Sequence, residues 1–340
     1  MLTRRIGVDL GTRTTRVLVK GEGVVSEEPS AVAAVDGDRR RAPAGLAALQ
    51  WAARAAPDPA AGPLVEWPIE GARIVDEAGL EALVRHATGQ GGGPPRLFRP
   101  DVVIAIASDC SGDDRRRLLA VAARTGSRTA HLIDAPLAAA LGADLPTDTA
   151  TGALVVHAGT VATEIAVICH EGTVARTAHP VGGRQLDRLL AARVAELTGV
   201  AVSAADAELL KHELRAGPAA VGGRGLAVTG SEVDPGRPAP TATVTEAELW
   251  PALLPTLDQL AAGVTRLLEA LPGRLAAAHR RHGAVLTGGT ALLAGLGGWL
   301  QDRSGLPVTV APDPERCCVL GTGRALDRLD SAGRQLLYMR

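Results

Sequence analysis

The sequence predicts an α/β fold of two similar domains that face each other across a cleft. An apolar, β-branched run ending in Asp9, a tight turn at Gly11 and Thr12, and a second β-rich run make up residues 6–20. Residues 154–168 repeat this strand–turn–strand pattern. The length of 340 residues also suggests two domains. A duplicated unit of this kind indicates duplicated domains, and gripping a phosphate from both sides is the economical use of that symmetry.

The two copies correspond at fixed offsets. The matched pairs are Asp9 with His157, Gly11 with Gly159, Thr12 with Thr160 and Thr15 with Thr163. The N–H groups of the first turn and the hydroxyls of Thr12 and Thr14 can face an anion, and Asp9 can hold a water on a metal that bridges phosphates. Two ordinary hairpins are the alternative, since Gly-Thr turns are common, but the matched offsets favour a phosphate site.

Composition limits the classes of protein that the chain can belong to. Apolar residues make up 46% and aromatic residues only 2%, so we expect cores packed with Ala, Val and Leu. The net charge of −1 gives no general attraction to nucleic acid or anionic lipid. Four cysteines show neither metal-ligand spacing nor a disulfide framework, and no signal peptide or bilayer-spanning run is apparent. We therefore expect a cytosolic protein.

The first half alternates strand and helix patterns, as an α/β domain does. Periodicity predicts strands over 30–35, 101–107 and 131–134, and helices over 44–56, 76–88, 113–125 and 136–142. A charged turn at 36–41, a loop at 57–68 and the Gly/Pro-rich stretch 89–95 separate them.

The second half continues the alternation after its own hairpin. Helices are predicted over 185–197, 204–215, 245–271, 293–301 and 316–329, and strands over 284–286 and 308–310. The long helix is expected to be interrupted at Pro251 and Pro255, because proline lacks the N–H that a helix interior needs. Residues 218–240 are expected to form two short strands joined by a loop.

Five motifs in order resemble those of the MreB family, the bacterial actin homologues. Residues 6–33 resemble the family's IDLGT hairpin, KG-x-G turn and EPSVVA strand. The others are 97–107 (LFKPRVV in the family), 133–142 (IEEPMAAAIG), 207–213 (AERIKHE) and 286–293 (LTGGGALL). The superfamily also contains actin, sugar kinases and the heat-shock chaperone ATPases, but the order and spacing favour MreB.

The resemblance implies an actin-like fold, of the actin/hexokinase/heat-shock chaperone ATPase superfamily, with four subdomains around an adenine-nucleotide cleft. The implied subdomains are IA (1–30, 96–147 and 316–340), IB (31–95), IIA (148–190 and 247–315) and IIB (191–246).

The resemblance also implies binding of ATP or ADP with Mg, which Asp9 would hold through water. Its implied contacts are the first phosphate turn (Asp9, Gly11, Thr12, Arg13 and Thr14), the second turn (Gly159 and Thr160), the ribose (Glu208 and Lys211), the adenine (Gly288, Gly289 and Thr290) and the far wall (residues 321–323). From the residues alone, Glu208 and Lys211 could equally form a solvated ion pair one helical turn apart. Arg13 could be an added phosphate contact or an exposed turn arginine.

Three departures from the family pattern suggest an impaired ATPase. His157 stands where the family has a metal-side aspartate, and two of the second turn's three glycines are gone. Val161 would crowd a backbone that must approach phosphate. Ala135 occupies the position of the family's water-orienting glutamate; Asp134 is adjacent, but it is shorter and leaves the strand in another direction. We therefore expect weak nucleotide binding and at most a weak ATPase.

The resemblance implies a filament-forming cytoskeletal protein, peripheral at the inner face of the cytoplasmic membrane, that guides cell shape and peptidoglycan synthesis. Its implied partners are itself or a true MreB, the membrane surface and the cell-wall synthesis machinery, but no nucleic acid. Leu97 and Phe98 would enter the lipid, or else cap the core where the strand 101–107 begins. The alternatives are a non-polymerising regulatory pseudo-ATPase and a small-molecule kinase, for which no cleft carboxylate base is evident.

Overall fold

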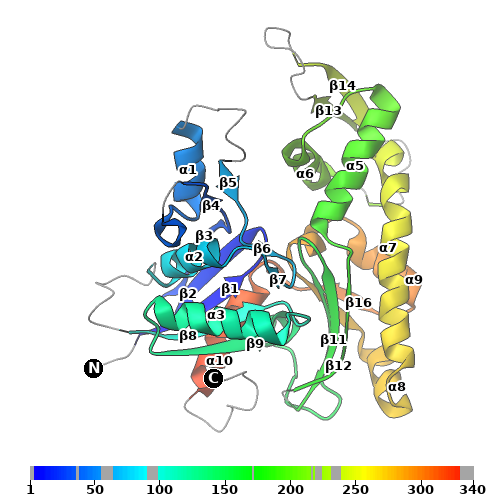
Figure 1. Cartoon of the computed structure of the whole chain (residues 1–340). Helices are drawn as coiled ribbons and strands as arrows, with labels where there is room; N and C mark the ends of the chain where they lie inside the picture. The colour runs from blue at the N-terminus through cyan, green and yellow to red at the C-terminus, as the bar shows by residue number, and fades with distance from the viewer. Residues whose placement is uncertain are drawn as a thin grey trace. The chain divides into compact units, whose positions relative to one another are not determined.

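The computed structural model describes residues 4–35, 38–54, 64–89, 99–170, 172–215, 217–218, 224–230 and 239–329. The chain divides into two compact units (Figure 1). The first comprises Met1–Gly152, Ile168–Thr173 and Arg316–Arg340, and the second comprises Ala153–Val167 and Val174–Glu315. The expected two domains are thus present, whereas the finer division into four subdomains stays a prediction.

The first unit is built on a five-stranded sheet of order β3-β2-β1-β8-β9. Its strands are β1 (Arg5–Leu10), β2 (Thr14–Val19), β3 (Gly23–Pro29), β8 (Asp101–Ile106) and β9 (Thr129–Asp134). The pairs β1–β2 and β2–β3 are antiparallel, and β1–β8 and β8–β9 are parallel. The turn between β1 and β2 therefore lies at the carboxyl end of the central parallel strand, where α/β sheets bind ligands.

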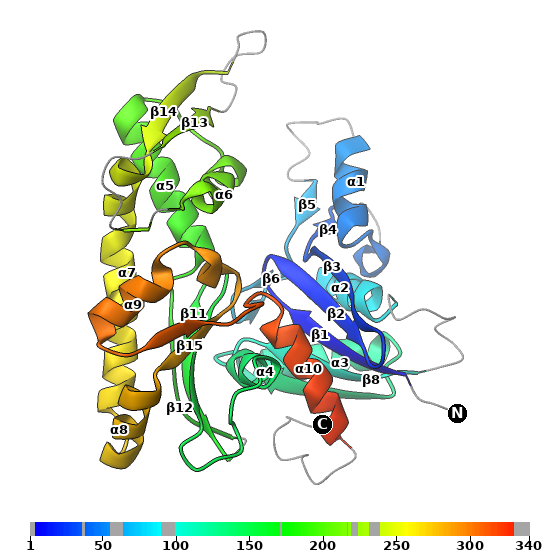
Figure 2. The same cartoon turned by 180° about the vertical axis from the view of Figure 1, so that it is seen from behind.

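Helices cover both faces of this sheet. Helices α2 (Glu77–Gly89) and α3 (Gly112–Arg124) pack on one face, where Ile6, Val8 and Leu10 are buried with them (Figure 1). Helices α4 (Ala135–Gly142) and α10 (Cys317–Arg328) lie on the other face (Figure 2). On this face, any side chain at Gly7 would overlap Thr322 of α10. Residues of β1 point alternately to the two faces of the sheet, so its large apolar side chains face α2 and α3 and its glycine faces α10.

A smaller layer extends from the first unit. It contains the 3₁₀ helix η1 (Arg39–Arg41), α1 (Leu46–Arg54) and the short strands β4 (Val32–Ala33), β5 (Val65–Glu66), β6 (Ile69–Glu70) and β7 (Arg73–Ile74). Its separate core consists of three fully buried alanines with Trp51 and Trp67 packed against them. The alanine-rich composition thus leads to thin, closely spaced layers.

The second unit repeats the strand order of the first, as β12-β11-β10-β15-β16. The strands are β10 (Ala153–Ala158), β11 (Thr163–Cys169), β12 (Gly172–His179), β15 (Ala284–Thr287) and β16 (Val308–Val310). The central strand β10 pairs in parallel with its neighbour β15, as β1 pairs with β8 in the first unit. The duplication predicted from the two hairpins is therefore a duplication of whole sheets.

The helices of the second unit are α5 (Gly183–Thr198), α6 (Ala204–Glu213), α7 (Glu246–Glu269), α8 (Gly273–His282) and α9 (Leu296–Ser304), with the 3₁₀ helix η2 (Gly289–Leu292). The antiparallel pair β13 (Gly225–Thr229) and β14 (Thr241–Thr245) confirms the two short strands expected within 218–240, although the second begins just after that range. Within the described residues, no helix combines the length and apolar character that spanning a bilayer requires.

The expected interruption of the long helix is wrong. Helix α7 is a single helix of 24 residues that contains both Pro251 and Pro255. The two prolines are exposed and four residues apart, so the carbonyls that lose their partners lie on the solvent side. The opposite face buries a continuous apolar row that includes Trp250, Leu253 and Leu257, and this packing holds the helix together.

Helices α4 and α10 approach so closely that side chains are excluded between them. A Cβ at Gly142 would overlap the carbonyl of Cys317, and one at Gly321 would overlap the carbonyl of Ala138. The glycines of 321–323, expected at a far nucleotide wall, lie inside this buried helix pair of the first unit. Gly321 lets the two backbones meet, whereas Gly323 leaves room for the Leu18 side chain of β2.

We therefore expect Gly321→Val to lower the free energy of unfolding by at least 1–3 kcal/mol, because overpacking a close backbone contact forces the helices apart. Gly112→Ala is the matched control, since a Cβ there meets only the far end of Arg116. Calorimetric melting of both variants checks this expectation. An unchanged melting temperature for Gly321→Val would contradict the described packing.

Candidate functional site

The carboxyl end of β1 holds a buried carboxylate. Asp9 pairs with Arg16 across the hairpin, and its Oδ2 lies 3.9 Å from Arg16 Nη1, too far for a hydrogen bond. Burial raises the pKa of Asp9 to about 6, and the positive charge of Arg16 only partly offsets that rise. Because this carboxylate is weakly compensated, a cation or a hydrated metal beside it would be stabilised.

Ser30, at the end of β3, fixes the first phosphate turn. Its Oγ donates to the carbonyl of Gly11 at 2.6 Å and lies 2.7 Å from Thr15 Oγ1. Its backbone N–H donates to the carbonyl of Arg13 at 3.0 Å. Ser30 is fully buried, so these bonds hold the turn in a single conformation.

The other predicted residues of this turn have neighbours of their own. Thr12 Oγ1 accepts a hydrogen bond of 3.0 Å from the N–H of Gly71, which keeps the hydroxyl hydrogen available for an anion. Arg13 lies over the Trp67 ring at 5.2 Å from its centroid. Arg13 is exposed and Thr14 is half-buried. The first turn is thus braced by residues of the smaller layer.

The position of the family's glutamate lies at the start of α4. Ala135 is buried, and its carbonyl accepts a hydrogen bond from Cys318 Sγ at 3.3 Å. Asp134 is also buried, and its Oδ1 accepts a hydrogen bond of 2.8 Å from Arg115 Nη2. Asp134 is thus bound to an arginine and makes no side-chain cap of α4.

The second turn has an imidazole where the first has a carboxylate. His157 Nδ1 lies 3.2 Å from Thr287 Oγ1, on the strand paired with β10. An imidazole bound to a hydroxyl adds no negative charge, so this position does not offer the carboxylate oxygen that magnesium prefers.

The backbone of the second turn is bound to the start of α5. Gly159 and Thr160 accept hydrogen bonds from the N–H groups of Gly183 and Arg184 at 3.1 and 2.8 Å, and the Gly159 N–H donates to the carbonyl of Ala162. Gly182 allows this approach, because a Cβ there would lie within 3 Å of the turn backbone. Every turn residue keeps a negative φ, so Val161 causes no backbone strain.

The predicted adenine residues join the same cluster. Gly288 has φ +87, and a Cβ there would overlap the carbonyl of Ala158. Its N–H donates to the carbonyl of Pro314 at 2.7 Å. Thr290 Oγ1 donates to the carbonyl of Gly159 at 2.8 Å, while a Cβ at Gly289 would approach Glu315. The LTGGT motif thus packs directly against the second turn.

Lys211 forms a buried ion pair. Its Nζ lies 2.6 Å from Asp187 Oδ1 on α5 and 3.4 Å from the carbonyl of Gly183. Lys211 therefore pairs with Asp187 and does not form the solvated ion pair with Glu208. Glu208 is half-buried one helical turn away. Burial raises the pKa of Asp187 against the lowering effect of Lys211. This pair places a lysine ammonium beside the N-terminus of α5.

The predicted site residues thus form two groups, one in each unit. Sequence reasoning missed Ser30, Gly71, Thr287 and Asp187. Of these four, only Asp187 could have been noticed in the sequence, because it is an acidic residue next to the apolar Leu186 in the helix predicted over 185–197. Leu97 and Phe98 lie outside the described residues, and the described residues contain no cluster of three or more metal-ligating side chains.

Solved structures define the class of the fold. MreB5 of Spiroplasma citri bound to AMPPNP aligns with a TM-score of 0.86 at 23% identity, over 97% of this chain and 98% of that one. A MamK double helical filament aligns with a TM-score of 0.76 at 19% identity, over 95% of this chain and 99% of that one. The chain has the actin-like fold of two duplicated sheet-containing domains.

Sequence comparison defines the family within that fold. The model of the MreB/Mbl protein family matches residues 3–334. The cell shape-determining protein MreB of Escherichia coli K12 is 33% identical over 338 residues, which covers 99% of this chain and 97% of that protein. Mbl of Bacillus subtilis is 27% identical over 99% of this chain and all of that protein. The chain belongs to the MreB/Mbl family of cell shape-determining proteins.

The raised pKa of Asp9 predicts a pH dependence of stability. A carboxyl whose pKa is about 6 in the folded protein and ordinarily 3.8 destabilises the fold when charged, and the cost at pH 7 is roughly 3 kcal/mol. This cost is present above pH 6 and disappears as the pH falls toward 4. We therefore expect Asp9→Asn to stabilise the protein at pH 8, by an amount that shrinks between pH 6 and 4.

Denaturant unfolding at pH 8, 6 and 4.5 measures this effect. Glu22→Gln is the control, because Glu22 is an exposed partner of Arg4 in the same hairpin region and its loss should change little. Destabilisation by Asp9→Asn at pH 8 would mean that Arg16 stabilises the carboxylate more than burial opposes it.

Proposed function

We propose that this protein is a cytoskeletal filament subunit that binds adenine nucleotide with weak or absent hydrolysis. It acts at the inner face of the cytoplasmic membrane, in cell shape and in the spatial organisation of peptidoglycan synthesis. The observation that carries the proposal is the pair of strand–turn–strand sites on matched sheets in a member of the MreB/Mbl family. The related MreB5 structures bound to AMPPNP and to ADP, and the MamK filament, support it.

In this proposal each of the two turns offers its own unit's groups to a nucleotide. The first turn offers its backbone and the Thr12 hydroxyl, and Asp9 offers an oxygen that fits the outer shell of a hydrated Mg²⁺. The ion would neutralise phosphate charge. In the second unit, Gly159 and Thr160 face phosphate, Lys211 and Glu208 face the ribose, and Gly288, Gly289 and Thr290 border the adenine.

The second turn weakens this binding. Its Gly159 N–H is already bound within the turn, and His157 is bound to Thr287. Ala135 cannot orient an attacking water, and Asp134 is bound to Arg115. Positioning and general-base catalysis contribute roughly 10²–10⁴-fold in rate, so hydrolysis near background is expected.

We expect calorimetric titration with Mg-ATP to give micromolar or weaker affinity. Charge-assisted hydrogen bonds are worth roughly 1.5–3 kcal/mol each, so two lost contacts at the second turn weaken binding about a hundredfold or more. Lys211→Met should weaken it further. Lys20→Met is the matched control, since Lys20 is the other lysine of the chain and pairs on the surface with Asp327. Nanomolar binding would refute the weakening assigned to the second turn.

Negative-stain microscopy with and without ATP tests the filament proposal, and co-sedimentation with liposomes tests the membrane contact. We expect filaments, and binding to liposomes that depends on assembly, because burying Leu97 and Phe98 gains only about 3–6 kcal/mol per subunit. Leu97→Ala with Phe98→Ala should abolish co-sedimentation while leaving melting nearly unchanged. A large fall in melting temperature would instead identify the pair as core.

The absence of filaments under all nucleotide conditions would favour a non-polymerising regulatory module of the same fold. Such a module could still bind nucleotide, so the titration and the microscopy are independent tests.

A further inference from the structure

The surface of the first unit has a hollow between η1 and α2. Its volume is about 390 Å³, and the chain segments around it contribute Arg40, Arg41, Arg85 and His86. Its floor is formed by short side chains that include the buried Ala44 and Ala82. Basic side chains around an apolar floor are suited to an anion, because the floor holds no acceptor that competes for their N–H groups.

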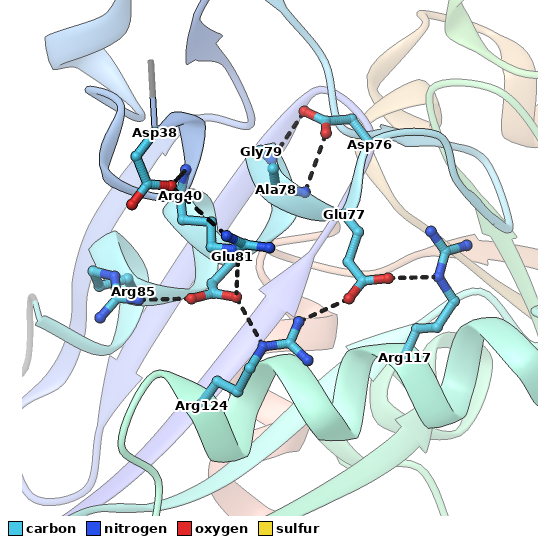
Figure 3. A network of polar contacts seen from close by, with 10 residues as sticks. All are labelled: Asp38, Arg40, Asp76, Glu77, Ala78, Gly79, Glu81, Arg85, Arg117 and Arg124. Carbon is cyan, nitrogen blue, oxygen red and sulfur yellow. Dashed lines mark hydrogen bonds and ion pairs between the residues drawn. The ribbon is translucent and has the colours of Figure 1, made fainter.

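Two of the arginines converge on one buried carboxylate. Glu81 of α2 accepts a hydrogen bond of 2.8 Å from Arg85 Nη2, and Arg40 Nε lies 3.7 Å from its other oxygen. Arg124 of α3 donates to that same oxygen at 2.9 Å (Figure 3). Figure 3 shows Glu81 between these three side chains, so one carboxylate is shared by three guanidinium groups.

Most donors of the guanidinium groups in the hollow are therefore uncommitted. A guanidinium has five N–H donors. Arg85 uses one of them on Glu81, whereas Arg40 makes only ion pairs of 3.7 and 3.9 Å, to Glu81 and Asp38. Arg41 is exposed, and its guanidinium makes no ion pair or hydrogen bond with any other residue that the structure describes.

The carboxylates nearby limit where an anion can lie. Glu81 is on the inner side and only 5% exposed, so an incoming anion must lie on the outer side of Arg40 and Arg85. Glu28 Oε2 lies 2.9 Å from His86 Nε2 and accepts a hydrogen bond from the N–H of Leu46, and no ion pair between Glu28 and the three arginines is present among the described contacts. The outer side thus keeps three arginine charges, which the inner Glu81 and the exposed Asp38 beside Arg40 together compensate only in part.

We propose that this hollow binds a phosphate group, presented by a soluble phosphorylated compound or by a phospholipid headgroup. A phosphate carries oxygens in several directions and can accept from guanidinium groups on different elements at once, as here on η1 and α2. This site belongs to the first unit alone and shares no residue with the two phosphate turns.

The test uses the full chain and two probes. Sodium pyrophosphate is titrated by calorimetry, and vesicles of phosphatidylcholine with or without phosphatidylglycerol are used for co-sedimentation, both at about 0.1 M salt to screen charges more than about 10 Å away. Arg41→Glu is the main variant, since it breaks no contact of the fold. Arg41→Gln with Arg85→Gln is the stronger variant. Arg116→Gln is the matched control, because Arg116 is 73% exposed on α3 and pairs only with Asp113.

We expect binding of at least one probe to fall about tenfold in Arg41→Glu and further in the double variant, with Arg116→Gln like the native protein. Pyrophosphate binding should protect η1 and α2 from hydrogen exchange, and Mg-ATP affinity should stay unchanged in Arg41→Glu. Loss with pyrophosphate assigns the site to soluble phosphates; loss only with phosphatidylglycerol vesicles assigns it to lipid. An equal loss in Arg116→Gln, or no effect of Arg41→Glu on either probe, overturns the proposal.

Discussion

Close backbone approach is the constraint on which the rest of this structure depends. With so few aromatic residues, the chain fills its interior with short side chains, and its elements must come nearer to one another to exclude space. The α4–α10 pair, with Gly142 and Gly321 at the contact, is the clearest case in the first unit. In the second unit, Gly182 and Gly288 let the start of α5 and the LTGGT loop touch the turn after β10. Glycine thus sets where backbones meet in both units, and in the second unit this contact also shapes the candidate site.

The two turns have the same topology but different chemistry. The first keeps a poorly compensated carboxylate and takes its support from outside, through Ser30 and Gly71, so its anion-facing groups are held in position. The second is likewise bound within its own unit, through α5, Thr290 and Thr287, but it carries an imidazole in place of the carboxylate. The two turns therefore share a strand order and a local hydrogen-bonded support but differ in the charge that they offer to a ligand.

The sequence predicted the fold well because its signals are local or repeated. The hairpin pattern appears twice with fixed offsets. The periodicity of apolar residues predicts the bounds of most helices and strands to within a few residues of those in the structure. It could not predict that Lys211 pairs with Asp187, because that contact joins two helices and depends on how they pack. The continuous α7 was missed for a related reason: Pro251 and Pro255 are tolerated because both face solvent, which is a property of the packed helix. Ser30 gave no signal, since a single serine after a strand has no distinguishing pattern.

The hydrogen bonds within the second turn have a consequence for how long an assembled polymer would last. A loop whose hydrogen bonds are already made gains little order when a ligand arrives, so the presence or loss of that ligand leaves little trace in its conformation. In an assembling subunit, such a loop would make polymer growth independent of whether the bound nucleotide has been hydrolysed. In the proposed filament, subunit concentration would then set polymer lifetime, in place of nucleotide hydrolysis.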